Sequence, residues 1–315
     1  MASSGSVKVV VAALGANGLI AVSKFIAAGI TGSAAMLSEA VHSVADTANQ
    51  GLLLFGIRRA RRVADARHPF GYSKELYFWS FVVAILLFSM GAGVSIYEGV
   101  QKLRHPHPIT APIVNYIVLG VAIVFELIST YVAVSEFNAQ RGGQGPIAAL
   151  RGSKDPALFT VVLEDLAALI GLVVALAGNL ASDLLGWLAA DAVASIAIGC
   201  VLAGVAAFMS LETKSLLIGE AASEEVVAGV RQLIEAEAAK SGAIKRIHTI
   251  RTMHLGPDDV LLTVRIDFED SVAAAEVERL VGALERAIRE RYPQIRRLFL
   301  ATAGSDAAAT APPQA

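Results

Sequence analysis

The sequence predicts an α-helical membrane domain followed by a smaller soluble α+β domain. Hydrophobic residues make up 55% of the 315 residues, charged residues make up 17%, and the mean hydropathy is +0.60. This composition is more apolar than that of an ordinary soluble domain. Charged residues gather after about residue 212, so we expect a membrane domain over residues 1–211 and a soluble domain over 212–302.

Six apolar stretches are long enough to cross a bilayer as helices. They cover residues 9–30, 34–57, 77–100, 113–136, 157–180 and 187–210. An even number of spans puts both ends of the chain on the same side of the membrane. Lysine and arginine gather in the second and fourth connections, whereas the first and fifth have none. The positive-inside rule therefore predicts that both termini are cytoplasmic.

The second stretch carries polar residues on one face. Glu39, His42 and Asp46 share that face on a helix, and Asn49 extends it. A carboxylate in hydrocarbon is costly unless it is paired, coordinated or faces a water-filled cavity. An imidazole and a carboxylate four residues apart can present nitrogen and oxygen to one divalent cation such as zinc. The stripe predicts metal or proton chemistry, and the main alternative is a hydrogen-bond network between helices.

The fifth stretch adds two adjacent acids. It begins at Pro156, because proline is favoured at the first position of a helix, and it continues through Glu164 and Asp165. Neighbouring residues on a helix point about 100° apart, so the two carboxylates cannot face the same way. If the fifth span packs against the second, one of them can complete a site with His42 and Asp46.

Outside the second and fifth stretches, the polar residues and the cysteine give weaker evidence for a functional site. Lys24, in the first span, is expected to reach the membrane surface or to pair with a carboxylate, and Glu126 is assigned no chemical role. Asp65 and His68 could meet around a turn and form a second metal site, although exposed polar loop residues are common. Cys200 is the only cysteine, so no disulfide is expected within the chain. Basic residues follow the membrane topology, so no nucleic-acid partner is expected.

The soluble domain has the pattern helix, strand, strand, helix, strand. Helical periodicity covers residues 224–239 and 275–291, and strand-like runs cover 244–255, 260–268 and 295–301. This αββαβ order resembles a small ferredoxin-like domain. The tail, residues 303–315, is low in complexity and is expected to be disordered.

Together these features resemble the cation diffusion facilitators, the zinc transporter family. The features are the six spans, SEAVHSVADTANQ in the second, DARHPFGYSKE after it, the acidic fifth span and the αββαβ domain. LEDLAALIG and TMHLGPDD are most similar to the zinc transporter 9 branch. The resemblance extends from about Val9 to Thr302. It implies a homodimer in the lipid bilayer that exchanges a divalent metal ion for protons, with no permanently bound cofactor.

The resemblance also implies a transport site on the second and fifth spans. Its implied metal ligands are His42, Asp46 and Asp165. Val161 stands where many members have His or Asp, so Glu164 is the expected fourth ligand, with water, Glu39 or Asn49 as alternatives. Because that position offers no nitrogen or carboxylate, the transported ion is Zn(II) or a similar ion among Mn(II), Fe(II), Co(II) and Cd(II).

Outside the membrane the resemblance implies little metal binding. Asp65 and His68 match two ligands of a second site in the family, but Tyr72 stands where another His is often found, so weak or absent binding is expected there. In the soluble domain His248 matches one metal-binding position of the family. Two positions where histidines would be expected hold other residues, Glu278 and Leu300. This domain is expected to be a dimerisation module with little or no metal.

The predicted function is export of Zn(II), or of a similar transition metal, from the cytoplasm in exchange for protons by alternating access. Ligands bind a metal ion only when deprotonated, so the ion would displace protons from His42 and the carboxylates. One alternative is a membrane-anchored regulatory or scaffold protein that keeps this fold. An enzyme is disfavoured because no HExxH motif is present. The lack of a transit peptide or a long His-rich loop favours a bacterial inner membrane.

Overall fold

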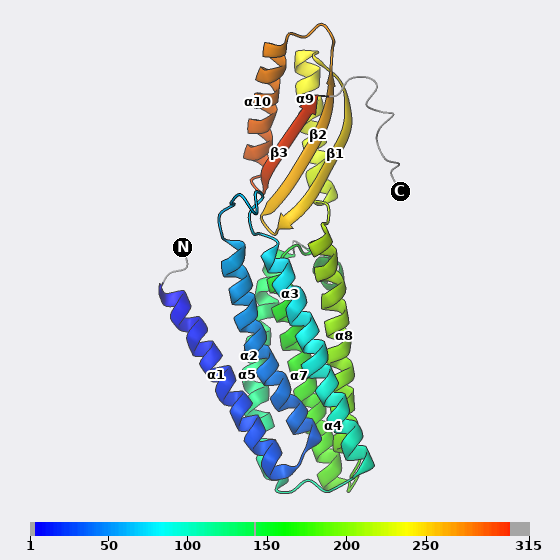
Figure 1. Cartoon of the computed structure of the whole chain (residues 1–315). Coiled ribbons are helices and arrows are strands. Elements are labelled where there is room, and N and C mark those ends of the chain that lie inside the picture. Colours follow the sequence, from blue (N-terminus) through cyan, green and yellow to red (C-terminus); the bar gives the residue numbers. More distant parts are fainter. Residues whose placement is uncertain (1–3, 142, 303–315) are drawn as a thin grey trace. The chain divides into compact units, whose positions relative to one another are not determined.

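The computed structural model describes residues 4–141 and 143–302. The tail for which disorder is predicted, residues 303–315, lies outside the described residues. The chain divides into two compact units, Met1–Lys214 and Ser215–Ala315. The first unit consists of helices, and the second is a small sheet with two helices (Figure 1).

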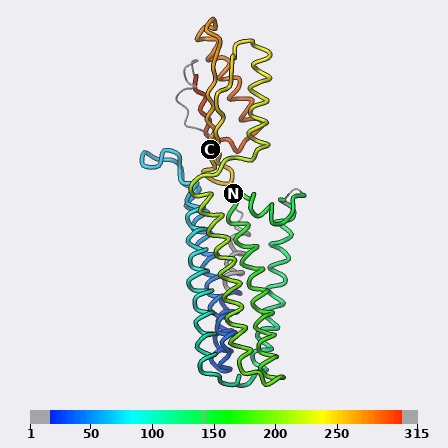
Figure 2. The backbone as a smooth tube through the Cα atoms, turned by 90° about the vertical axis from the view of Figure 1, so that its right-hand side faces the viewer, coloured from blue at the N-terminus to red at the C-terminus, as the bar shows by residue number. Residues whose placement is uncertain are grey.

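Long helices run beside one another in the first unit (Figure 1 and Figure 2). Their bounds are α1 Ser4–Thr31, α2 Ala34–Ala60, α3 Glu75–Leu86, η1 Leu87–Ala92, α4 Gly93–Arg104, α5 Pro112–Gln140, α6 Pro146–Gly152, α7 Pro156–Leu184 and α8 Ala190–Ile218. Four segments of the described residues are long and apolar enough to cross a membrane: Glu75–Arg104, Pro112–Ala139, Pro156–Leu184 and Ala190–Ile218. The chain is therefore an integral membrane protein. Helix α2 is as long, but its polar stripe and terminal arginines interrupt its apolar sequence.

Residues that favour helix starts lie at the beginning of several of these helices. Ser33 caps α2, because its hydroxyl accepts a hydrogen bond from the Met36 backbone N–H at 3.0 Å. The Asp155 carboxylate caps α7 in the same way through the N–H of Ala157 at 3.0 Å. Proline at the first or second position opens α5, α6 and α7, where its missing N–H has no partner to lose. The helix start predicted at Pro156 is therefore confirmed.

The apolar segment Glu75–Arg104 is interrupted by η1, a six-residue π-helix between α3 and α4. Beyond it, α4 packs closely on α8 through glycine. A Cβ atom on Gly99 would lie 2.6 Å from Ile196, and one on Gly199 would lie 2.6 Å from Ile96. Both helices therefore need glycine at the crossing, as helices in lipid commonly do.

A buried polar network joins the helices where α1 ends and α2 begins. Asp191, at the start of α8, is 0% exposed, and its carboxylate accepts hydrogen bonds from Ser33 Oγ at 2.5 Å and Lys102 Nζ at 2.8 Å. The backbone N–H of Ala34 and the side-chain amide of Asn179 also donate to it, at 2.7 and 3.4 Å. Lys102, at the end of α4, is itself only 5% exposed. One carboxylate thus connects the α1–α2 turn with α4, α7 and α8.

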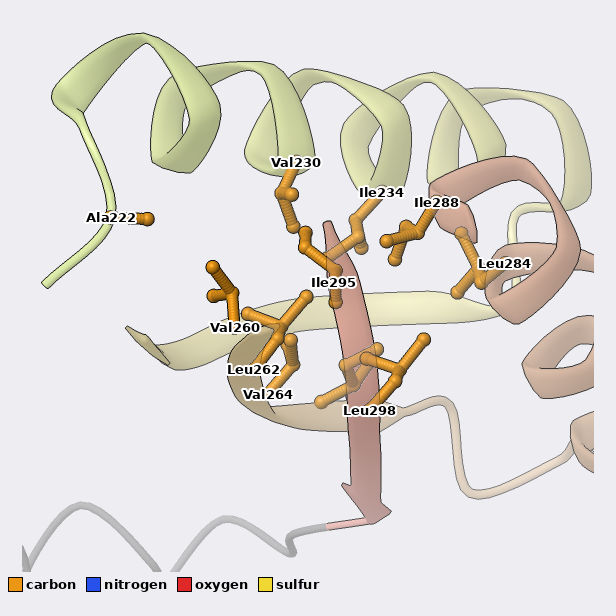
Figure 3. Close-up of a cluster of buried hydrophobic side chains, with 11 residues drawn as sticks. Ala222, Val230, Ile234, Val260, Leu262, Val264, Leu284, Ile288, Ile295 and Leu298 are labelled. Carbon is orange, nitrogen blue, oxygen red and sulfur yellow. The ribbon is translucent and has the colours of Figure 1, made fainter. Parts of the chain in front are cut away.

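The second unit contains α9 Glu224–Ser241, β1 Ile244–Gly256, β2 Asp259–Phe268, α10 Ala274–Arg291 and β3 Ile295–Thr302, in the predicted order. Strand β2 is central, antiparallel to β1 and parallel to β3. Val230 and Ile234 of α9 and Leu284 and Ile288 of α10 point at the apolar side chains of β2 and β3 (Figure 3). Both helices therefore cover one face of the sheet, and the alternation of buried residues along β2 sets its register.

Candidate metal centre

Helices α2 and α7 are in contact, as the predicted site requires. The side-chain amide of Asn49 on α2 donates a hydrogen bond to Glu164 Oε1 on α7 at 2.7 Å. Both side chains are buried, so this bond is shielded from water. The polar stripe of α2 and the acidic part of α7 therefore face each other.

His42 is the most unusual member of the α2 stripe. It is 1% exposed, and its Nδ1 lies 3.4 Å from Asp46 Oδ1. Neither ring nitrogen of His42, nor Oδ1 of Asp46, has a hydrogen-bond partner among the described residues. Buried polar atoms are almost always paired, because an unpaired one loses its hydration without compensation. An imidazole nitrogen and a carboxylate oxygen left free side by side are the donor atoms that a borderline divalent cation binds.

Glu164 and Asp165 diverge, as their adjacency on a helix requires. Glu164 faces α2 and accepts the hydrogen bond from Asn49, whereas the Asp165 carboxylate accepts one from Ser129 Oγ of α5 at 2.8 Å. Both are buried. Only Asp165 lines the cavity that Asp46 also lines.

This cavity, with a volume of about 290 Å³, lies among α1, α2, α5 and α7. Its charged lining residues are Lys24, Asp46, Glu126 and Asp165. In the part of the chain that the structure describes, no three His, Cys, Asp or Glu side chains are arranged to hold a metal ion. Of the predicted transport-site ligands, Asp46 and Asp165 line this cavity, whereas His42 and Glu164 do not. A metal ion would have to draw these side chains together.

The contacts of Glu39, Asn49 and Val161 bear on the fourth ligand of the predicted metal site. Glu39 Oε2 lies 3.1 Å from Lys24 Nζ, and the Asn49 side-chain NH2 group donates to Glu164, but Glu39 Oε1 and Asn49 Oδ1 have no hydrogen-bond partner among the described residues. Val161 packs against an apolar cluster that includes Phe137 of α5. Position 161 thus contributes to helix packing rather than to a polar site, which agrees with its departure from the family pattern.

Sequence reasoning missed two residues of the cavity, Lys24 and Glu126. Lys24 was expected to pair with a carboxylate or reach the surface, and it does pair, but it also lines the cavity. Glu126 was assigned no role, yet it shares the cavity with Asp165. The signal that could have identified Glu126 is its position in the middle of an apolar helix, three residues before Ser129 on the same face.

The second predicted site lies in the loop between α2 and α3, which projects from the helix ends (Figure 2). Asp65 Oδ1 accepts hydrogen bonds from the backbone N–H groups of Arg67 at 3.0 Å and His68 at 2.7 Å. Its Oδ2 accepts one from Tyr72 Oη at 2.6 Å. His68 Nδ1 lies 3.6 Å from Asp65 Oδ1. Both carboxylate oxygens are already used, so a metal ion would have to displace these bonds, and the weak or absent binding expected here stays a prediction.

We predict that Tyr72→Phe raises the pKa of Asp65. The hydrogen bond from the Tyr72 hydroxyl, followed by that from the His68 backbone, lowers the pKa of Asp65 below its ordinary value. Because the folded-state pKa is the lower one, this stabilisation of the turn is present above the ordinary pKa and is lost as the pH falls through the folded value. Carboxyl ¹³C NMR titration should show the increase in Tyr72→Phe but not in Tyr97→Phe, whose hydroxyl accepts a hydrogen bond from Gln101 on α4. An unchanged pKa in Tyr72→Phe would contradict the role of this bond.

In the second unit, His248 lies beside an acid rather than in a cluster of ligands. Its Nε2 is 3.8 Å from Asp267 Oδ2. Glu278 is exposed on α10, and Leu300 packs against the core of the unit. The interpretation of this unit as a domain with little or no metal stays a prediction.

Comparison with known proteins agrees with this geometry. Residues 10–218 match the family model described as the cation efflux transmembrane domain. The chain is 35% identical over 270 residues to the human protein named "Proton-coupled zinc antiporter SLC30A9, mitochondrial", covering 85% of this chain and 47% of the human one. It is 32% identical over 285 residues to metal tolerance protein C4 of Arabidopsis thaliana, covering 90% and 61%.

A further relative is magnetosome protein MamB of Magnetospira sp., which is 25% identical over 270 residues, covering 85% of this chain and 84% of MamB. The chain spans about half the length of its human relative. The family model covers more than half of this chain, including both helices of the candidate site. The chain therefore belongs to the cation efflux family, the cation diffusion facilitators, and within it resembles the zinc transporter 9 branch.

Proposed function

We propose that this chain is a divalent metal cation/proton antiporter that exports Zn(II), or a similar transition metal, from the cytoplasm. The observation that carries the proposal is the buried imidazole of His42, which lies beside Asp46 and has no hydrogen bond among the described residues. Such a pair, in a helix packed on an acidic membrane helix, is suited to transient metal binding. Membership of the cation efflux family and the name of the human relative support the same function.

The transport site that we propose consists of His42, Asp46 and Asp165, with Glu164 as the fourth ligand and water, Glu39 or Asn49 as alternatives. Asp46 and Asp165 line one cavity from α2 and α7, which supports their sharing one ion. Glu164 accepts the hydrogen bond from Asn49 on Oε1 alone, so it would join through Oε2 or by exchanging that bond for the metal ion. Each ligand must lose its proton before it binds, so metal entry releases protons and reprotonation on the other side releases the metal.

We further propose that α1 and α2 join the four apolar segments to give six spans, with both termini in the cytoplasm. The basic residues of the α2–α3 and α5–α7 connections support this topology: Arg58, Arg59, Arg61, Arg62, Arg67, Lys74, Arg141, Arg151 and Lys154. The membrane expected from the sequence is a bacterial inner membrane, whereas the human relative is named mitochondrial. The transport site does not depend on this choice.

In this arrangement the second unit is a cytoplasmic, ferredoxin-like dimerisation domain. Its helix and strand order and its mixed sheet support that fold. Phe299 alternates along β3 with the core residues Leu298 and Leu300 and is 53% exposed on the opposite face. A large aromatic side chain that is exposed on the sheet face opposite the two helices supports a homodimer.

The test is proton flux in proteoliposomes that contain the purified protein and a pH-sensitive dye. Zinc, manganese, cobalt, iron and cadmium would be added in turn, with protein-free liposomes as the control. We expect zinc-dependent proton movement, and the order of the other metals would report the selectivity of a site that has Val161 in place of a ligand. No flux with any metal from a correctly folded protein would instead favour a regulatory or scaffold protein.

A further inference from the structure

Lys24 places a positive charge in the same cavity as the proposed transport site. It lies on α1, is 3% exposed, and its Nζ donates hydrogen bonds to Glu39 Oε2 at 3.1 Å and Ser43 Oγ at 2.8 Å. A lysine ammonium has only donors and cannot coordinate a metal ion. Its effect on a cation in this cavity is therefore repulsion.

Glu39, the ion-pair partner of Lys24, lies outside the cavity. It is 0% exposed. Its Oε1 has no hydrogen-bond partner among the described residues, and a Cβ atom on Gly171 of α7 would collide with that oxygen. The backbone of α7 thus closes over the Glu39 carboxylate, which is held close to α7 while its other oxygen binds the ammonium.

The cavity therefore has an uneven charge distribution. Asp46, Glu126 and Asp165 contribute carboxylates from three helices, and Lys24 contributes one ammonium from a fourth. Charges in a site with little water interact more strongly than they do in bulk water. The ammonium therefore opposes a metal ion that enters, while it offsets part of the negative charge when no metal is present.

We propose that Lys24 is a fixed internal cation that weakens the hold of the transport cavity on its metal ion and so speeds metal release. Lys24 is thus an affinity- and rate-setting residue. This inference rests on the proposed function, because it assumes that metal ions pass through this cavity. The competing interpretation is a purely structural link between α1 and α2, to which the ion pair also contributes.

Two variants separate these interpretations. Glu39→Gln makes the pair one unit more positive, whereas the double variant with Lys24→Met leaves the net charge of the pair unchanged but removes the ammonium that lines the cavity, together with a carboxylate that does not line it. Glu39→Gln keeps the ammonium and removes its counter-charge, so the metal Kd and the KM for zinc-driven proton flux should both rise. Lys24→Met combined with Glu39→Gln removes the whole pair and leaves no unpaired buried charge. In that double variant the Kd and the KM should fall, and kcat should fall as well because release becomes slower. A change of roughly tenfold in each direction corresponds to about 1.4 kcal/mol.

The measurements are calorimetric zinc binding in detergent and flux in proteoliposomes, with thermal unfolding as a check of folding. The matched control is Glu276→Gln combined with Arg279→Met, which removes an exposed ion pair on α10 and should change neither KM nor kcat. If both cavity variants lower kcat at unchanged KM and Kd, Lys24 is only a structural link and the inference is overturned. If the double variant does not fold, Glu39→Gln alone decides, and a KM and Kd at or below the wild-type values overturn the inference.

The same experiment keeps this inference apart from the proposed function. Absence of proton flux in the wild-type protein with zinc and with each of the other four metals would overturn the proposed function. Wild-type flux without opposite shifts in the two variants would overturn only the role of Lys24.

Discussion

Asp46→Ala and Asp165→Ala should each abolish metal-driven proton flux while the protein remains folded. The two carboxylates line one cavity from α2 and α7. Loss of either removes a charged oxygen ligand, for which water is a poor replacement. Changes to groups that merely support a ligand already cost about 10–100-fold in metal affinity or activity, so loss of a ligand should cost at least about 100-fold.

Folding should survive these substitutions. Asp165→Ala removes one hydrogen bond from Ser129, which costs about 1 kcal/mol. Flux in proteoliposomes and size-exclusion chromatography would be measured on the same preparations. Asp183→Ala is the matched control, because Asp183 is an exposed acid on the same helix and does not line the cavity. Zinc-driven flux that persists in Asp46→Ala or Asp165→Ala would contradict the assignment of that residue.

Of the single substitutions proposed for this protein, Asp191→Ala should cause the largest decrease in the free energy of unfolding. The substitution leaves Lys102, which is 5% exposed, without the carboxylate that its Nζ contacts at 2.8 Å. Removing one partner of a buried ion pair costs about 3–5 kcal/mol, because the remaining charge loses its counter-charge. Lys102 Nζ would keep its hydrogen bond to the Gly32 carbonyl oxygen at 2.7 Å, which carries no full charge. The single variant should therefore unfold at a clearly lower temperature or denaturant concentration than the wild type in the same detergent.

The double variant Asp191→Ala/Lys102→Met tests the cause of this loss. It removes the stranded charge as well, so part of the stability should return relative to Asp191→Ala. If the double variant is no more stable than the single one, the hydrogen bonds from Ser33 and Ala34 outweigh the ion pair. Unfolding followed by tryptophan fluorescence would measure all three proteins.

Helices and strands could be predicted from the sequence because their signals are local. Apolar stretches, a proline start at 156 and alternation along β2 each depend on neighbouring residues. The divergence of Glu164 and Asp165 also follows from helix geometry alone. The short helix α6 and the π-helix η1 were not predicted, since a π-helix has the same composition as the α-helices around it.

The contacts that could not be predicted from the sequence join residues that are distant in the chain. Ser33 and Asp191 are separated by 158 positions, and Asn49 and Glu164 by 115. A sequence pattern identifies each of these residues as polar in an apolar setting, but not which partner it meets. For the same reason Lys24 was expected to pair with some carboxylate, while its place in the cavity required the packing of four helices.

The position of Asp191 also has a consequence for biogenesis. A growing chain makes the α1–α2 turn and the Lys102 end of α4 well before α8 leaves the ribosome. Until then Lys102 has no Asp191 carboxylate to bind, and Ser33 has no acceptor there. The Lys102–Asp191 ion pair can therefore form only when α8 inserts. A chain that stops before α8 would leave the Lys102 ammonium without its counter-charge inside the helix bundle.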